Sequence, residues 1–337
     1  MPDEVVLYTL GGTIAMAGTT SGPGGTVVAR LSGADLAATV PGFDALLTEG
    51  GTRLRIEDVT RHPSADLTFA QIADLVERAG QAVREGAAGV AVTQGTDTLE
   101  ETAFLADLLW AHEEPLVFTG AMRNPTLAGA DGPANLLAAV RTAAAPQARG
   151  LGVLVAFDDE LHPARYVRKT HATSTATFRS PETGPVGHLE EDRVRILTRP
   201  PRRAPLPAPS AGAFAATRVP VHTFVLDEDD DTSLAGFAPH VAGLVVAGFG
   251  VGHVPGRTAP ALGELAARIP VVLTSRTGAG PVLRNTYGAP GAETDLQRRG
   301  LINGGRLGPY KARILLRTLL AAGADDARVR AAFDEHG

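Results

Sequence analysis

The sequence predicts an α/β protein with a larger N-terminal domain on a doubly wound parallel sheet and a smaller C-terminal α/β domain. Short apolar runs rich in β-branched residues alternate with segments of helical periodicity, which is typical of β-α-β units. The chain has 337 residues, enough for two domains of ordinary size. The proline-rich stretch 199–217 is the expected linker, because it cannot continue a helix or a central strand. The predicted domains are therefore residues 1–198 and 218–337.

The composition excludes several kinds of chemistry and of partner. There are no Cys residues, which removes disulfides, thiolate nucleophiles and Cys-based zinc sites. The nine His residues include no HxxH or HExxH pair, so a His-based metal site is not expected. The 31 Lys and Arg residues against 37 Asp and Glu give a net charge of -6, and the Arg residues are scattered. Nucleic acid is therefore not an expected partner.

The N-terminal stretch predicts residence in the cytoplasm. Met1-Pro-Asp-Glu is acidic and runs directly into an apolar strand, without the basic and long apolar regions of a signal peptide. No apolar run approaches the roughly 18 residues of a spanning helix, so a membrane partner is not expected either.

The first strand is expected at Val5–Tyr8 and runs into a turn with two glycines before Thr13. Glycine permits a tight turn and lets a ligand approach the backbone beside Thr13. The phosphate-loop patterns GxGxxG and GxxxxGK[ST] are absent here. The glycine-rich segment 18–25 that follows is either a lid over a site or a plain connection.

A second strand, Val90–Thr93, ends abruptly in Gln94-Gly95, and a helix is expected to begin at Thr98. Thr98 and Glu101 have the spacing of a capping box, so Thr96 and Asp97 fall in the turn between strand and helix. In open α/β sheets such turns lie at the carboxyl edge, where ligands bind. The turn therefore serves either as a helix start or as part of a ligand site.

Further elements continue the β-α alternation. Pro133 suits the first turn of a helix, and Lys169 follows the strand after it. The other predicted strands lie at 116–119, 152–157, 219–225, 241–247 and 271–275, and the other helices at 69–83, 259–269 and 307–322.

Thr13 and Thr96 each stand at the end of a predicted strand, and they converge if those strands are neighbours. A threonine hydroxyl is a poor nucleophile, so it needs a base and donors for the oxyanion. Lys169 is a candidate base if burial favours its neutral form and Asp97 holds it in place. The backbone N–H groups of the two threonines are the candidate oxyanion donors.

Five motifs resemble those of the bacterial-type L-asparaginases, in the same order. Two correspond to the family signatures usually written TGGTIA and HGTDTMEETA, and three are supporting blocks. In this sequence they read Tyr8-Thr-Leu-Gly-Gly-Thr13-Ile-Ala, Val92-Thr-Gln-Gly-Thr96-Asp97-Thr-Leu-Glu-Glu-Thr-Ala, Phe118-Thr-Gly-Ala-Met-Arg, Ala130-Asp-Gly-Pro-Ala-Asn-Leu and Lys169-Thr-His-Ala-Thr-Ser-Thr-Ala-Thr-Phe178. The resemblance runs over nearly the whole chain.

The resemblance implies two α/β domains, a homotetramer or at least a homodimer, and hydrolysis of the side-chain amide of L-asparagine, without metal or cofactor. Thr13 matches the nucleophile that forms the acyl-enzyme. Thr96, Asp97 and Lys169 match the second threonine with its Asp and Lys. Asp97 also matches the residue that binds the substrate's α-amino group. The other implied substrate-binding residues are Gly12, Ser64, which matches the α-carboxylate ligand, and Ala121.

The sequence departs from the family at the partners of the nucleophile. Thr26 stands where many members have a loop tyrosine, and the segment expected to hold the partner-subunit glutamate, 283–286, has no acid. Tyr287 and Glu293 are the candidate replacements. Two alternatives follow: an amidohydrolase acting on glutamine or another amide, or an amino-acid-binding protein without turnover.

Overall fold

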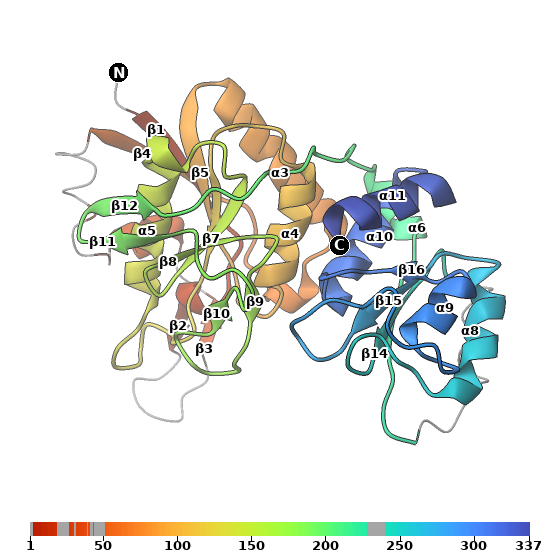
Figure 1. The fold of residues 1–337 in the computed structure, drawn as a ribbon. Helices are drawn as coiled ribbons and strands as arrows, with labels where there is room; N and C mark the ends of the chain where they lie inside the picture. Colours follow the sequence, from red (N-terminus) through yellow and green to blue (C-terminus); the bar gives the residue numbers. More distant parts are fainter. Residues whose placement is uncertain are drawn as a thin grey trace. The chain divides into compact units, whose positions relative to one another are not determined.

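The computed structural model describes residues 3–18, 27–29, 32–38, 40, 43, 51–227 and 240–337. The chain forms two compact units, residues 1–205 and 206–337, each drawn as a ribbon in Figure 1. The proline-rich segment 199–217 ends in a short helix, α6 (Ala211–Ala216). Both units are α/β, which confirms the predicted fold class.

Unit 1 is built on an eight-stranded sheet. In spatial order its strands are β12 (Arg193–Ile196), β11 (Gly187–Glu190), β8 (Glu160–Pro163), β7 (Val153–Phe157), β6 (Leu116–Thr119), β5 (Ala87–Thr93), β1 (Asp3–Thr9) and β4 (Thr52–Asp58). The five strands from β7 to β4 are parallel, whereas β8, β11 and β12 pair antiparallel. The sheet is therefore mixed: its larger part is parallel as predicted, and the antiparallel edge of β8, β11 and β12 adds to that prediction.

The change of strand direction has a local cause. Only Asp158 and Asp159 separate β7 from β8, and both have positive φ, 53° and 58°. Two residues with positive φ form the hairpin turn that matches the twist of an antiparallel pair. A parallel return needs a crossover of a dozen or more residues, so this connection forces β8 to run backwards.

Helices cover both faces of the sheet (Figure 1). One face packs on α5 (Gly132–Ala144), through alternate strand residues such as Val5, Leu7 and Ala91. The strand residues between them, among them Val6 and Val90, are also fully buried, and they point to the opposite face. That face is covered by α3 (Phe69–Arg84) and α4 (Leu99–Leu109).

Smaller elements complete unit 1. They are the hairpin of β2 (Met16–Gly18) and β3 (Val27–Ala29), α1 (Gly33–Ala38), the pair β9 (Arg168–Lys169) and β10 (Phe178–Arg179), and the 3-10 helices η1 (Thr13–Ala15), η2 (Ser64–Asp66) and η3 (Pro146–Ala148). Residues 19–26 lie outside the described part of the chain, so the expectations for the loop 18–25 and for Thr26 stay predictions.

Unit 2 contains a four-stranded parallel sheet with helices around it. Its strands are β13 (Val221–Thr223), β14 (Leu244–Gly248), β15 (Val271–Ser275) and β16 (Ile302–Asn303). Its further helices are η4 (Gly256–Thr258), α8 (Ala259–Ala266), α9 (Glu293–Arg298), α10 (Pro309–Ala321) and α11 (Asp326–His336). The predicted strands and helices of this half are present within a few residues of their expected bounds. Among the described helices, none is long and apolar enough to cross a membrane.

Candidate active site

The two threonine-bearing turns lie against each other at the carboxyl edge of the larger sheet. Their strands, β1 and β5, are neighbours, with Thr9 opposite Thr93. Gly12 has a φ of +89°, and a Cβ there would lie 2.2 Å from the backbone nitrogen of Gly95. A contact this close is possible only because position 12 has no side chain. The structure thus brings together the segments that carry Thr13 and Thr96.

Thr13 begins the short helix η1 and is partly exposed. The turn that contains Thr13 is closed by a hydrogen bond from the Ala15 N–H to the Gly12 carbonyl, 3.0 Å. Gly11, with φ +93°, packs on the backbone of Arg61 and His62. The nucleophile candidate therefore stands on a turn held from two sides by backbone.

Thr96, Asp97 and Lys169 form one connected group. The Lys169 ammonium donates to the Thr96 hydroxyl at 2.9 Å and to the Asp97 carboxylate at 3.2 Å. Thr96 is buried, whereas the Asp97 side chain is 70% exposed and can meet a ligand from solvent. A lysine that touches a threonine hydroxyl can take its proton when the amine is neutral. This geometry suits activation of a hydroxyl or of a water bound to it.

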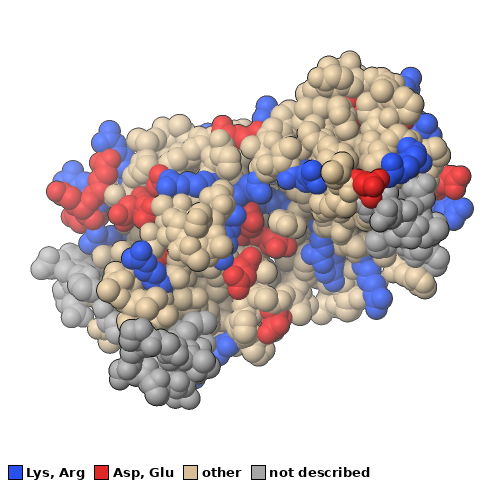
Figure 2. All heavy atoms as spheres, turned by 90° about the horizontal axis from the view of Figure 1, so that it is seen from below, with Lys and Arg blue, Asp and Glu red and all other residues tan. Residues whose placement is uncertain are grey.

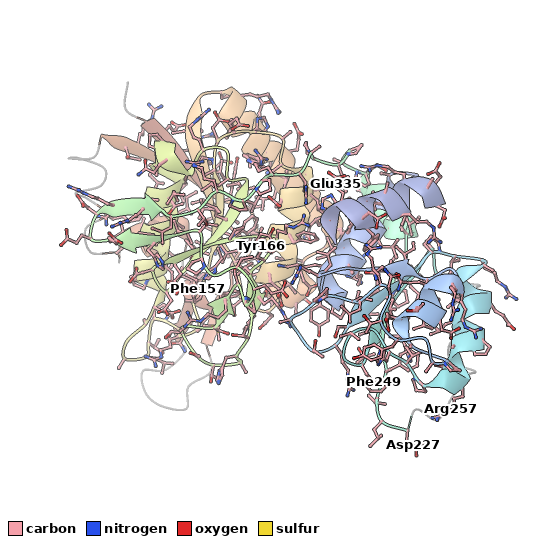
Figure 3. The ribbon with its side chains drawn as sticks, in the orientation of Figure 1. Phe157, Tyr166, Asp227, Phe249, Arg257 and Glu335 are labelled. Carbon is pink, nitrogen blue, oxygen red and sulfur yellow. The ribbon has the colours of Figure 1, made fainter. Side chains whose placement is uncertain are left out.

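The position of Lys169 depends on the hairpin of β9 and β10. Lys169 is paired with Phe178, and the Phe178 ring lies 4.7 Å from that of Phe157 on β7. Phe157 is labelled in Figure 3. Ser180, the residue after β10, forms a hydrogen bond of 3.0 Å with Nδ1 of His162 on β8. Burial lowers the pKa of His162 to about 4, so this anchor is a neutral imidazole at pH 7. The hairpin is thereby tied to the main sheet.

Ser64 lies in η2, next to the turn that holds Asp97. Its hydroxyl oxygen accepts the Asp97 N–H at 3.2 Å, and its carbonyl accepts the Thr98 hydroxyl at 2.8 Å. The predicted capping box of Thr98 and Glu101 is wrong. The Thr98 hydroxyl donates to the Ser64 carbonyl and makes no cap hydrogen bond with its own helix. This tertiary contact is what the local spacing did not reveal.

Gln94 is a site residue whose role the sequence did not indicate. It is fully buried, accepts a hydrogen bond from the Thr102 hydroxyl at 2.9 Å and donates to the Gly95 carbonyl at 3.2 Å. It therefore ties the turn to α4. The sequence feature that could have indicated this role is the position of Gln94, directly after a buried strand and before the glycine of the turn.

Ala121 follows β6 and is buried. A Cβ on the preceding residue, Gly120, would lie 2.6 Å from the Gln94 carbonyl oxygen and 3.2 Å from the Thr96 side chain. The loop after β6 thus packs against the same turn. Together with Gly12 and Ser64, Ala121 belongs to the segments that line the paired threonines.

Tyr287 and Glu293 lie in unit 2, and they belong to one cluster. The Glu293 carboxylate is fully buried and accepts the backbone N–H groups of Thr286 at 2.9 Å and Tyr287 at 2.6 Å, and His253 lies 3.2 Å away. Burial alone would raise the pKa of Glu293, but the hydrogen bonds from Tyr287 and Thr286 lower it overall. Glu293 therefore shapes the loop that presents Tyr287, whose side chain is half exposed and meets His253 edge-on.

No group of three or more His, Cys, Asp or Glu side chains that could hold a metal ion occurs among the described residues. The site consists of hydroxyls, one amine, one carboxylate and backbone N–H groups. Fold and site together define a two-domain α/β protein with two threonine-bearing turns in contact at the carboxyl edge of its larger sheet.

Comparison with known proteins identifies the class. Residues 4–202 match the family model "Asparaginase, N-terminal", and residues 218–333 match "Glutaminase/Asparaginase C-terminal domain". The chain belongs to the asparaginase family.

Individual relatives agree over nearly the full length. The chain is 32% identical to the L-asparaginase of Bacillus licheniformis over 96% of this chain and 97% of that protein. It is 34% identical to a probable L-asparaginase of Deinococcus radiodurans, covering 93% and 95%. A crystal structure of a probable cytoplasmic L-asparaginase from Campylobacter jejuni superposes with a TM-score of 0.86 at 27% identity, covering 98% and 99%.

Proposed function

We propose that this protein hydrolyses the side-chain amide of L-asparagine to L-aspartate and ammonia. The observation that carries the proposal is the contact of Lys169 with Thr96 and Asp97, beside the turn that holds Thr13. Hydroxyl, amine and carboxylate are the groups that acyl transfer through an ester requires. The names of the family models and of the relatives agree with this reaction.

The reaction proceeds in two halves. In the first, the Thr13 hydroxyl oxygen attacks the amide carbon, backbone N–H groups stabilise the oxyanion, and ammonia leaves with the proton that the hydroxyl gives up. In the second, water attacks the ester, and Thr96 with Lys169 accepts its proton. The bond to Thr13 breaks, L-aspartate leaves, and Thr13 recovers its hydrogen.

The charges of the site suit an α-amino acid. The exposed Asp97 carboxylate is complementary to the α-ammonium group. The Ser64 hydroxyl already accepts the Asp97 N–H, so its own hydrogen can point to the α-carboxylate. The start of α4 lies in the same place and favours an anion. Gly12 and Ala121 lie in the segments that pack against the turn of Thr96, so their backbone groups are available to a substrate bound there.

Ammonia release from purified protein tests the proposal. We expect release from L-asparagine by the wild type and loss of release in Thr13→Val, which keeps the shape of the side chain but removes the oxygen. Release at the background rate by the wild type would contradict the proposal. Calorimetry with L-aspartate then detects the alternative of a binding protein, which would bind the amino acid without turnover.

Glutamine is the second candidate substrate, since the C-terminal family model bears both names. A panel of amides under the same assay separates the two. A tRNA-linked amide fits less well, because acidic and basic side chains are interspersed over each unit in Figure 2, without a basic stripe on the face shown.

Assembly and location belong to the same proposal. We infer a homotetramer, or at least a homodimer, in which Tyr287 of one copy serves the threonine site of another, while the buried Glu293, the other candidate, holds the loop of Tyr287. Support comes from the Glu293 cluster, which fixes the loop of Tyr287 and leaves half of the Tyr287 side chain exposed. Light scattering measures the number of copies in the assembly. Ammonia release by Tyr287→Phe tests whether the Tyr287 hydroxyl takes part in the reaction. Cell fractionation tests the cytoplasmic location.

A further inference from the structure

The starting residues of the helices differ in what their side chains bind. Three helices, α3, α6 and α11, begin with ordinary caps. Thr68 accepts the Gln71 N–H, Ser210 the Ala213 N–H and Asp325 the Arg328 N–H. Each satisfies a backbone N–H that the first turn of a helix leaves without a partner.

The starting residues of α4 and α5, at the carboxyl edge of the larger sheet, behave differently. Thr98 starts α4 and Asp131 starts α5, and both are residue types that favour this position. Neither side chain accepts a hydrogen bond from a backbone N–H of its own helix. Thr258 at the start of α8 also makes no cap, but its hydroxyl binds the Pro255 carbonyl three residues away, within its own turn.

Asp131 directs its carboxylate to the loop after β6. Oδ1 accepts the Arg123 N–H at 2.8 Å, and Oδ2 accepts the Met122 N–H at 3.0 Å. Asn135, one turn later on α5, donates to Asp131 and to the Gly120 carbonyl at 3.0 Å. The residues on both sides of Ala121 are therefore held by the start of α5.

The start of α5 also touches the nucleophile's turn. A Cβ on Gly132 would lie 2.9 Å from Cγ1 of Ile14 and 3.4 Å from Cβ of Ala121. Ile14 directly follows Thr13, so one helix start contacts both the Thr13 turn and the loop of Ala121. A shift of the Ala121 loop is therefore expected to move the start of α5 and, through Ile14, the turn that holds Thr13.

Thr98 performs the matching task for the other half of the site. Its hydroxyl donates to the carbonyl of Ser64, which is 34 residues away in the chain, and the Asp97 N–H donates back to the Ser64 hydroxyl. These two bonds set the distance between η2 and the turn at Asp97.

We propose that Asp131 and Thr98 are positioning residues, which forgo capping their own helices in order to hold the two loops that line the threonine site. Asp131 fixes residues 120–123 beside the nucleophile's turn, and Thr98 fixes Ser64 beside Asp97. The inference rests on the proposed amide hydrolysis for its kinetic consequences, but the order of the loops is measurable without any substrate.

The test compares Asp131→Ala and Thr98→Val with the cap variants Ser210→Ala and Asp325→Ala, which lie in the other unit. The cap variants should lower the melting temperature and leave kcat/KM for L-asparagine within about twofold, since they touch no site loop. Asp131→Ala should lower kcat about 10-fold or more through displacement near Thr13. Thr98→Val should mainly raise KM, because Ser64 is expected to bind the substrate's carboxylate.

Conservative variants separate positioning from general loss of structure. Thr98→Ser keeps the hydroxyl and should recover the wild-type KM. Asp131→Asn keeps one oxygen for the Met122 and Arg123 N–H groups and should recover part of kcat. Recovery should be incomplete, because the new amide nitrogen cannot accept the hydrogen bond that Asn135 donates to Asp131. Failure of both to recover activity above the Ala and Val variants would contradict the proposal.

Hydrogen exchange measured by mass spectrometry supplies the readout that is independent of catalysis. Amides of residues 120–124 should exchange faster in Asp131→Ala than in the wild type, and should be unchanged in Ser210→Ala. Unchanged exchange in Asp131→Ala, or equal kinetic effects in the site and cap variants, would overturn the inference. Absence of ammonia release by the wild type would overturn the proposed function instead, while the exchange result still decides the positioning role.

Discussion

Replacing Gly12 by alanine tests the contact on which the two-threonine site depends. The new Cβ would lie 2.2 Å from the Gly95 nitrogen and 2.7 Å from the Gln94 carbonyl carbon. Both are backbone atoms, so no side chain can turn away to make room. An ordinary contact begins near 3.4 Å, and the two turns must therefore separate by about 1 Å.

Two energetic terms set the loss of stability expected for Gly12→Ala. Alanine at φ +89° costs roughly 1–2 kcal/mol because its Cβ approaches the following carbonyl. Overpacking adds roughly 1–3 kcal/mol. A displacement of about 1 Å between reacting groups lowers the rate about 100-fold, so kcat should fall by at least that factor.

Gly86→Ala is the matched control. Gly86 has a similar φ of +106°, but nothing lies within 4 Å of its missing Cβ. This variant carries the conformational strain without the collision, and it should lose melting temperature while keeping kcat. Ammonia release and thermal unfolding followed by circular dichroism measure both effects. A Gly12→Ala enzyme with the kcat of Gly86→Ala would refute the reasoning.

Two further predictions concern the Lys169 hairpin. His162 is neutral in the fold, and its pKa of about 4 is below the ordinary value of 6.5. The unfolded chain therefore takes up the proton first, and the free energy of unfolding should fall as the pH drops below about 6.5, by roughly 2 kcal/mol at pH 5. Urea unfolding of wild type and His162→Asn at pH 7 and 5 checks this, because the variant should lack that part of the decrease; identical pH dependence would contradict it. Lys169→Arg should lose kcat about as fully as Lys169→Met, since a guanidinium does not take up a proton from Thr96 at neutral pH; steady-state kinetics showing recovery by Arg would exclude proton transfer to Lys169.

Local sequence signals were sufficient where structure is decided by neighbours along the chain. The buried strands at Val5–Tyr8 and 116–119 and the helix with Pro133 in its first turn are present as predicted. Their apolar periodicity and turn residues act over a few positions, which is the range that sequence patterns report. The glycines beside Thr13 were equally informative, because a conformation with positive φ favours glycine wherever the chain needs it.

The sequence by itself determined the two α/β units, the placement of Thr13 and Thr96 at strand ends, and the likeness to one family. The tertiary structure alone decided how side chains with several possible partners are used. Thr98 has the local pattern of a cap but binds Ser64, and Asp131 starts a helix but holds the loop after β6. The physical reason is competition: a hydroxyl or carboxylate binds whichever backbone groups the fold brings within reach, and those groups lie up to 34 residues away.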